Sequence, residues 1–289
     1  MAADASLDTP ARVASWHQRR RVPVAAGLAA VVLIGVAILA VFGEFLAPHD
    51  PAAQNLFATL RPPSESHLLG TDDLGRDVLS RLITGTRSAV AGPLVVAAAC
   101  AVIGGSLGLL AGFRGGITDA TVNRLTDVLY ALPGLLVAIV LVGVAGGGYW
   151  LTALVLILLS FPYQTRLCRS ATLAQSRLTY VDAARTLALP ARRIMFRHLL
   201  PNIAPTLLTA FLLDFTSALI AYSALDYLGL GVAPGLPDWG GMIAEGQAYV
   251  AANPWVSLAP ALAIIATAAG ATLLGDWAFD RLSQRTVRR

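Results

Sequence analysis

Six long apolar segments constrain the fold of this chain more than any other feature of its sequence. An α-helix needs about 20 mostly apolar residues to cross the hydrocarbon core of a bilayer. The charged fraction of 13% supports the same interpretation, since roughly 25% is usual for a soluble domain. We therefore predict an all-α, polytopic membrane protein with six transmembrane helices. The predicted spans are Val22–Gly43, Ser88–Gly112, Val128–Gly147, Tyr149–Thr165, Ile203–Leu225 and Pro254–Gly275.

The arginines predict how the chain is oriented, because cytoplasmic loops of membrane proteins are enriched in basic residues. All 21 basic residues are arginine, and 17 of them fall on the cytoplasmic side if the N-terminus is cytoplasmic. The outer connection Asp226–Asn253 has three acids and no arginine. We therefore place both termini in the cytoplasm. The predicted parts are a cytoplasmic tail (1–21), the first span (22–43), an extracytoplasmic segment (44–87), a core (88–275) with a cytoplasmic loop (166–201) and an outer loop (226–253), and a cytoplasmic C-terminal tail (276–289).

Several classes of function are disfavoured by what the sequence lacks. The arginines are divided among the apolar segments and form no patch with aromatic residues, which argues against binding of nucleic acid. Cys100 and Cys168 suggest neither a disulfide framework nor a metal site. His49 and His67 are eighteen residues apart without a further ligand cluster, so no metal site is predicted. A phosphate-binding Gly-Lys-Ser/Thr loop is excluded because the chain has no lysine.

A basic, helical loop lies between two of the apolar segments. It reads "YVDAARTLALPARRIMFRHLLPN" over Tyr180–Asn202. We expect a first helix over Leu173–Ala188 and a second over Pro190–Leu200, which Pro201 ends because proline cannot continue a helix. Apolar residues beside fixed positive charge suit a docking site for a cytoplasmic partner. They also suit a helix that lies on anionic lipid, and the pattern alone leaves both readings open.

This loop resembles the EAA loop of the membrane subunits of bacterial ABC importers. Asp182, Ala183 and Ala184 match the start of that motif, and Leu200 with Pro201 matches its end. The resemblance implies a coupling helix that docks into a cleft of an ATPase subunit. From the resemblance and the basic pattern of the loop together, the residues that we predict to dock are Asp182, Ala183, Ala184, Arg185, Ala188, Pro190, Arg192, Arg193, Ile194, Arg197, Leu200 and Pro201.

Two positions of the loop depart from the motif. His198 stands where the family has a hydrophobic residue, and Ala188 stands in place of a glycine. If the backbone at Ala188 is left-handed, as the glycine implies, alanine adopts it at a cost of roughly 1–2 kcal/mol.

Two further stretches narrow the resemblance to permeases of dipeptide and oligopeptide importers. They are "HLLGTDDLGRDVLSRLITGTRSAV" (His67–Val90) and "LDYLGLGVAPGLPDWGGMIAEG" (Leu225–Gly246), and the similarity extends from about Phe45 to Arg281. It implies a type I ABC importer permease of the C type in the bacterial inner membrane. The implied partners are a second permease, two ATPase subunits that hold ATP and Mg, and an extracytoplasmic substrate-binding protein. This chain itself would bind no cofactor.

Three rival functions remain to be weighed. Nickel-chelate and haem importers have very similar permeases, so the resemblance does not separate them from peptide importers. A membrane-embedded enzyme would need a nucleophile and a base on facing spans, and the predicted spans hold no histidine. A self-powered secondary transporter is disfavoured because Asp214 is the single ionisable residue well inside a span. Asp214 is therefore either a group of the pathway or gate, or a packed, hydrogen-bonded acid.

The outer segments contain the remaining candidate residues. Thr71 can cap a helix whose first turn holds two aspartates, and such a helix would be either a solvated surface helix or a clasp beneath a docked binding protein. We expect Asp73–Arg76 and Asp77–Arg81 pairs at helical spacing. The segment Leu225–Gly246 should form a bent turn rather than a helix, with Trp239 and Trp255 at the membrane interface. The predicted contacts with a binding protein are Asp72, Asp73, Arg76, Asp77, Asp238, Trp239 and Glu245.

Overall fold

The computed structural model describes residues 22–233 and 235–287. Within these ranges all regular structure is helical, apart from one isolated β-bridge between Thr71 and Asp77. The all-α prediction is confirmed. The predicted tail 1–21 lies outside the described residues.

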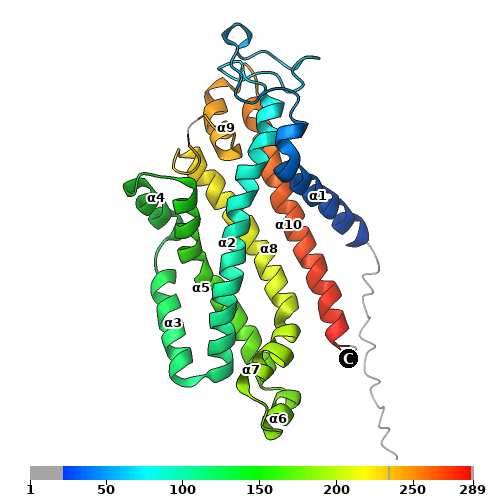
Figure 1. The fold of residues 1–289 in the computed structure, drawn as a ribbon, viewed down its shortest axis with the longest axis vertical. Coiled ribbons are helices and arrows are strands. Elements are labelled where there is room, and N and C mark those ends of the chain that lie inside the picture. Colours follow the sequence, from blue (N-terminus) through cyan, green and yellow to red (C-terminus); the bar gives the residue numbers. More distant parts are fainter. Residues whose placement is uncertain (1–21, 234, 288–289) are drawn as a thin grey trace, which may run out of the picture.

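Five helices are long and apolar enough to cross a membrane. They pack side by side into an elongated bundle with α2 and α8 near its centre; α1 and α10 lie on one side, and α5 with two shorter helices lies on the other (Figure 1). The five helices are α1 (Val22–Leu46), α2 (Val78–Arg114), α5 (Tyr149–Ser176), α8 (Leu200–Tyr227) and α10 (Trp255–Val287). Helix α10 therefore continues through much of the predicted C-terminal tail, 276–289.

The third predicted span, Val128–Gly147, is a broken helix. Where a straight helix was expected over 128–147, the chain forms α3 (Gly116–Tyr130) and α4 (Gly134–Val144), which meet at an angle of 75°. Pro133 explains the break, because proline has no N–H to donate and disfavours helical geometry in the residue before it. The predicted number of spans is reached when this bent pair is counted as one span.

Helices α2 and α5 approach each other through a row of small residues. Gly104, Gly108 and Gly112 of α2 recur every fourth residue and face α5. A Cβ atom on Gly108 would lie 2.5 Å from the Thr165 carbonyl oxygen, and one on Gly112 would lie 2.8 Å from that of Arg169. Glycine is needed at these positions because any side chain would push the two backbones apart.

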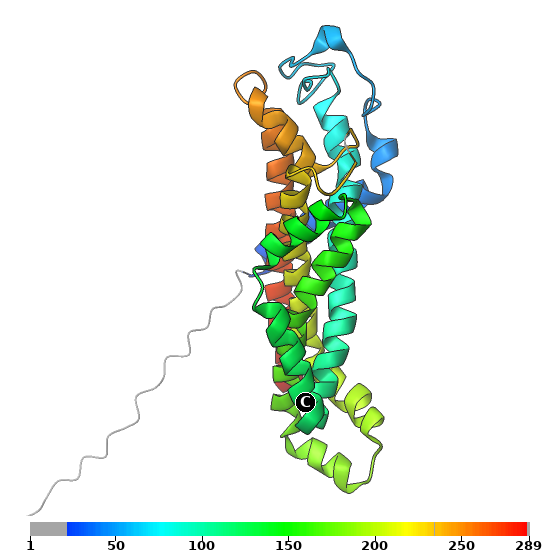
Figure 2. The same ribbon diagram turned by 90° about the vertical axis from the view of Figure 1, so that its left-hand side faces the viewer.

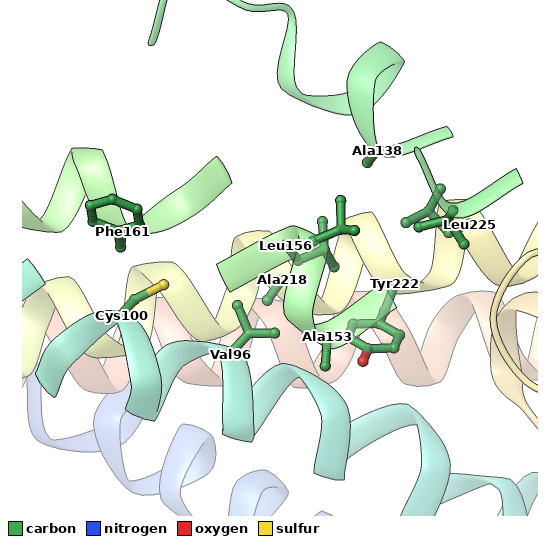
Figure 3. Close-up of a cluster of buried hydrophobic side chains, with 11 residues drawn as sticks. Val96, Cys100, Ala138, Ala153, Leu156, Phe161, Ala218, Tyr222 and Leu225 are labelled. Carbon is green, nitrogen blue, oxygen red and sulfur yellow. The ribbon is translucent and has the colours of Figure 1, made fainter. Parts of the chain in front are cut away.

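A buried apolar cluster joins four helices at the middle of the bundle (Figure 3). The Tyr222 hydroxyl, inside this cluster, donates a hydrogen bond to the Tyr149 carbonyl at 2.8 Å. Its polar group is thereby satisfied within the apolar surroundings. The cluster contains Val96, Cys100, Ala138, Val142, Ala153, Val155, Leu156, Phe161, Ala218, Tyr222 and Leu225.

Candidate functional site

The basic hairpin, which we define as residues 179–199, lies at one end of the bundle (Figure 2). The expected helix over Leu173–Ala188 is wrong, because α5 already contains Leu173 and ends at Ser176. The backbone is extended at Leu178, and a new helix, α6 (Thr179–Thr186), then begins. This change of direction buries Val181 and Ala184 against α2 and α5.

A left-handed residue closes α6. Ala188 has a φ of +54°. The left-handed turn that the family's glycine implies at this position is therefore present, although the residue here is alanine. The Leu189 amide donates to the Ala184 carbonyl at 3.2 Å, and the Ala188 amide donates to that of Arg185 at 2.9 Å. These two bonds form a Schellman motif, which satisfies the free carbonyls at the end of a helix. The hairpin therefore turns at a defined angle.

The second limb of the hairpin continues into α8 without a break. Pro190 precedes α7 (Ala191–Arg193), a π-helical turn follows over Ile194–Leu199, and α8 begins at once. The prediction that Pro201 ends a helix is therefore wrong. The Leu200 amide donates to the Met195 carbonyl, five residues earlier, so the turn just before Pro201 is wider than a regular helical turn. The ring of Pro201 would crowd a regular turn, and the wider one lets the helix continue through the proline.

The predicted docking residues divide between the surface and the interior of the hairpin. Ala184 and Ile194 are buried, so they fix the hairpin to the bundle and are not available to a partner. Leu200 is half-buried. The exposed members of the predicted set are Asp182, Ala183, Arg185, Ala188, Pro190, Arg192, Arg193, Arg197 and Pro201.

Two exposed apolar side chains belong to the same surface but were missed from the sequence. Leu187 is 74% exposed at the tip of the hairpin and Phe196 is 58% exposed on its second limb. Apolar side chains that stand out beside arginines are typical of the centre of a protein interface. The π-helical turn shifts the register of the second limb, so helical periodicity could not have predicted the outward position of Phe196.

The opposite end of the bundle carries a loop cap, which we define as residues 47–77 together with α9 (Trp239–Gly246) (Figure 1). The buried Asp72 carboxylate accepts from Arg76 at 2.7 Å and from Arg81 at 2.6 Å. Glu245 of α9 also accepts from both arginines, at 3.0 and 2.6 Å. The four side chains join the loop, the first turn of α2 and α9 into one unit.

The start of α2 differs from the predicted one. Asp77, not Thr71, caps the helix, and its carboxylate accepts from the Ser80 amide at 2.8 Å and from the Ser80 hydroxyl at 2.7 Å. Thr71 instead donates to the carbonyl of Ala58. The expected solvated helix is therefore wrong, because the loop is tied down by its own buried polar groups. Burial raises the pKa of the Asp77 carboxyl, but hydrogen bonds with Ser80 and His67 outweigh it and hold that pKa below its ordinary value.

The segment 225–246 is not a turn throughout, because its last part forms α9. Asp238 caps this helix by accepting from the Gly241 amide at 2.9 Å, and burial raises the pKa of its carboxyl. Trp239 is 2% exposed, and its indole N–H donates to the Leu82 carbonyl at 3.1 Å. The prediction of an interfacial Trp239 is therefore wrong, since the side chain locks α9 onto α2.

The burial of the cap limits which predicted residues can contact a binding protein. The side chains of Asp73 and Glu245 are 29% and 32% exposed, so contact by these two stays a prediction. The other predicted contact residues are buried and paired within the chain: Asp72, Arg76, Asp77, Asp238 and Trp239. They shape the cap from inside.

Asp214 lies on α8 between the two ends and is 6% exposed. Its Oδ2 atom has no hydrogen-bond partner in the described part of the chain. The residue lines a cavity of about 470 Å³ beside the break between α3 and α4. Tyr130, Ser160 and Ser217 line the same cavity. An unpaired buried carboxyl oxygen at a cavity favours the pathway interpretation over that of a fully hydrogen-bonded acid.

The comparisons with known proteins identify the family. Residues 104–288 match the family of binding-protein-dependent transport system inner membrane components. The chain belongs to this family. Residues 16–63 also match the N-terminal transmembrane domain of oligopeptide transport permease C. As a member of a family of ABC importer permeases, the chain is a multi-pass membrane protein and a transport component.

Three curated relatives cover most of the chain. The chain is 37% identical to the glutathione transport system permease protein GsiD of Pectobacterium atrosepticum, over 98% of this chain and 93% of that protein. It is 35% identical to the probable D,D-dipeptide transport system permease protein DdpC of Escherichia coli, over 89% of this chain and 86% of that protein. It is 37% identical to the di/tripeptide transport system permease protein DppC of Pseudomonas aeruginosa, over 86% of this chain and 84% of that protein.

The fold is shared with a solved ABC transporter. A chain from inward-facing structures of the MetNI methionine ABC transporter matches with a TM-score of 0.57 and 21% identity. The match covers 72% of this chain and 96% of the other. The predicted type I permease fold is confirmed at the level of the helical arrangement.

Proposed function

We propose that the chain is the pore-forming permease subunit of an ATP-driven importer for small peptides. The curated relatives are named for the transport of glutathione, D,D-dipeptides and di/tripeptides, which share a peptide backbone. The assembly would contain this chain, a second related permease, two ATPase subunits and an extracytoplasmic binding protein. ATP and Mg would be bound by the ATPase subunits, since this chain has no lysine with which to build a Gly-Lys-Ser/Thr loop.

The surface of the basic hairpin is the observation that carries this proposal. Leu187 and Phe196 stand out into solvent beside Arg192, Arg193 and Arg197. The backbone beneath them is fixed by the left-handed turn at residue 188 and by a buried apolar cluster. A rigid, partly apolar and positively charged protrusion suits insertion into a cleft of an ATPase, where its movement would transmit work.

Helix α8 supplies a mechanical path from the hairpin to the middle of the membrane. The chain is helical without interruption from Ala191 to Tyr227, and Asp214 lies on this stretch. A force applied at Arg197 would therefore move the wall of the cavity at Asp214. The π-helical turn at the base of α8 is the place where such a helix can change its winding, as π-turns do at other functional sites.

The orientation of the chain follows from this assignment. The basic hairpin would face the cytoplasm together with both termini, in agreement with the distribution of the arginines. The loop cap would face the binding protein, and its ion pairs between Asp72, Arg76, Arg81 and Glu245 would keep the docking surface rigid.

Replacement of the three hairpin arginines tests the proposal. In proteoliposomes that contain the whole importer, serine at positions 192, 193 and 197 together should leave ATP hydrolysis in place but reduce peptide uptake by about tenfold or more, since each lost charged contact is worth up to 1.5–3 kcal/mol and 1.4 kcal/mol is tenfold. Serine at the exposed Arg114 and Arg124, on the same side of the bundle, is the control and should change neither activity. Full hydrolysis and full uptake in the triple variant would show that these residues do not dock.

Competition during uptake tests the cargo. Unlabelled di- and tripeptides should suppress the uptake of a labelled dipeptide, whereas nickel chelates and haem should not. Suppression by either metal complex alone would assign the permease to the corresponding importer class instead.

A further inference from the structure

Two histidines that are far apart in the sequence meet at the start of α2. His49 follows α1 by three residues, and His67 lies in the loop that precedes α2. Their rings are 4.9 Å apart between centroids, and both face the Asp77 carboxylate. The Nδ1 atom of His67 is 2.9 Å from Asp77 Oδ1, and that of His49 is 3.7 Å from Asp77 Oδ2.

From this cluster we infer that His49, His67 and Asp77 form a binding site for a divalent transition-metal ion of the Zn²⁺ type. Zn²⁺ binds imidazole nitrogen and carboxylate oxygen at about 2.0–2.2 Å, so neighbouring ligand atoms lie roughly 3–3.5 Å apart around it. The two measured separations bracket that range, and the ligand atoms of all three residues lie within 4.8 Å of one another. Small side-chain rotations therefore suffice to close the shell.

The choice of metal follows from the donor atoms. Two imidazoles and one carboxylate suit zinc and its neighbours in the first transition row, whereas Mg²⁺ and Ca²⁺ prefer oxygen ligands alone. Three protein ligands leave a position for water or for a group from a partner. The His49 side chain is 45% exposed, which gives an ion a route into the site.

The surroundings hold the carboxylate in place for this role. Ser80 donates to Asp77 Oδ2 through its amide and its hydroxyl, and the same hydroxyl accepts from the His49 amide at 3.0 Å. Asp77 Oδ1 is therefore turned toward His67. Hydrogen bonds of this kind orient metal ligands in established sites.

The charge balance separates this cluster from another acidic group in the cap. Asp72, Asp73 and Glu245 also lie close together, but Arg76 and Arg81 contact them and supply the positive charge. Among the described residues, the charged partners of Asp77 are the two histidines alone. No arginine among the described residues forms an ion pair with this carboxylate, so its negative charge is available to a cation.

A bound ion would add one further connection between three parts of the chain. It would join the segment that follows α1, the loop before α2 and the N-cap residue of α2 at a single point. We therefore expect zinc to stabilise the loop cap, and this inference does not depend on the identity of the transported cargo.

Metal analysis of the purified, full-length permease in its complex tests the site. The complex should carry no polyhistidine tag, because such a tag would bind the ion itself. Both the natural complex and the double variant His49→Gln/His67→Gln are dialysed against micromolar free Zn²⁺. We expect the natural complex to retain one more zinc ion per permease chain than the double variant. Each single variant should weaken zinc binding by at least about tenfold, because loss of a ligand should cost no less than loss of its supporting hydrogen bond. Co²⁺ in place of Zn²⁺ should give visible absorption bands that the double variant lacks.

Two controls make the result specific. His198→Gln, in the basic hairpin at the other end of the bundle, should leave zinc binding unchanged. Asp77→Asn should weaken it while keeping the helix cap, since asparagine caps helices as well as aspartate does. Equal zinc content in the natural and double-variant complexes, or an effect of His198→Gln as large as that of His49→Gln, would overturn the inference and leave the cluster as a hydrogen-bonded helix cap only.

Discussion

At the scale of single residues, Ala188 shows how a departure from a family motif can be tolerated. Its left-handed conformation costs alanine roughly 1–2 kcal/mol. The Schellman hydrogen bonds and the burial of Ala184 and Val181 beneath it offset that cost. The hairpin therefore keeps the geometry that glycine would give, with some stored strain.

Release of that strain is the first residue-scale prediction. Ala188→Gly should slow hydrogen exchange of the amides in α6 by up to about fivefold, the equivalent of about 1 kcal/mol, because glycine adopts positive φ without a steric penalty. Ala183→Gly is the matched control and should accelerate exchange by a similar factor, since it places glycine inside the helix. Faster exchange in the Ala188→Gly protein would contradict the turn described here.

Asp214 gives the second residue-scale prediction. Asp214→Asn keeps the size of the side chain but removes its ability to bind a cationic group of a peptide in the adjoining cavity. Uptake should fall about tenfold, the loss expected for one charged hydrogen bond, while the amount of assembled complex stays constant. Ser217→Ala lines the same cavity without an ionisable group and should have little effect. Unchanged uptake by Asp214→Asn in vesicles would remove this residue from the pathway.

At the scale of helices, the contact between α2 and α5 depends on the absence of side chains. Gly108→Ala should lower the melting temperature of the detergent-solubilised complex, because overpacking of this kind costs about 1–3 kcal/mol. Gly105→Ala should not lower it, since nothing lies within 4 Å of the added methyl group. Tryptophan fluorescence during heating measures both, and equal melting temperatures for the two variants would contradict the close approach.

The helices were predicted correctly from the sequence where the length of an apolar segment determines that a helix forms. The prediction failed where tertiary contacts decide the local direction of the chain. Pro201 follows a π-helical turn and does not end a helix, whereas Pro133 separates two helices as its chemistry suggests. No local pattern distinguishes these two prolines, because the difference lies in the turn that precedes each of them.

The functional residues could be predicted only in part for a similar reason. Asp182 was found because a motif marks it, and the hairpin arginines were found because they form a basic, helical pattern. All of them are exposed, as docking requires. The pairing of Arg81 with Asp72 and, across 164 residues, with Glu245 depends on how α9 folds back onto α2. The meeting of His49 and His67 likewise depends on the path of the loop cap.

At the scale of the whole molecule, the two ends of the bundle differ in structure and in surface chemistry. The hairpin and the cap lie at opposite ends of the bundle (Figure 2). The hairpin exposes apolar and basic side chains, whereas the cap is closed by buried ion pairs. Helices α2, α5 and α8 connect them through the buried cluster around Tyr222 and Cys100. Such an arrangement suits a subunit that receives mechanical work at one end and responds in the cavities between the helices.

Cross-linking from two adjacent alanines tests the central claim most directly. Ala183 is exposed on α6, whereas Ala184 beside it is 5% exposed, and both native cysteines are buried. In the assembled importer, Ala183→Cys carrying a thiol-reactive photo-crosslinker should capture an ATPase subunit, and Ala184→Cys should capture little. Capture of phospholipid alone from Ala183→Cys, with no ATPase attached, would contradict the proposal that the hairpin couples ATP hydrolysis to transport.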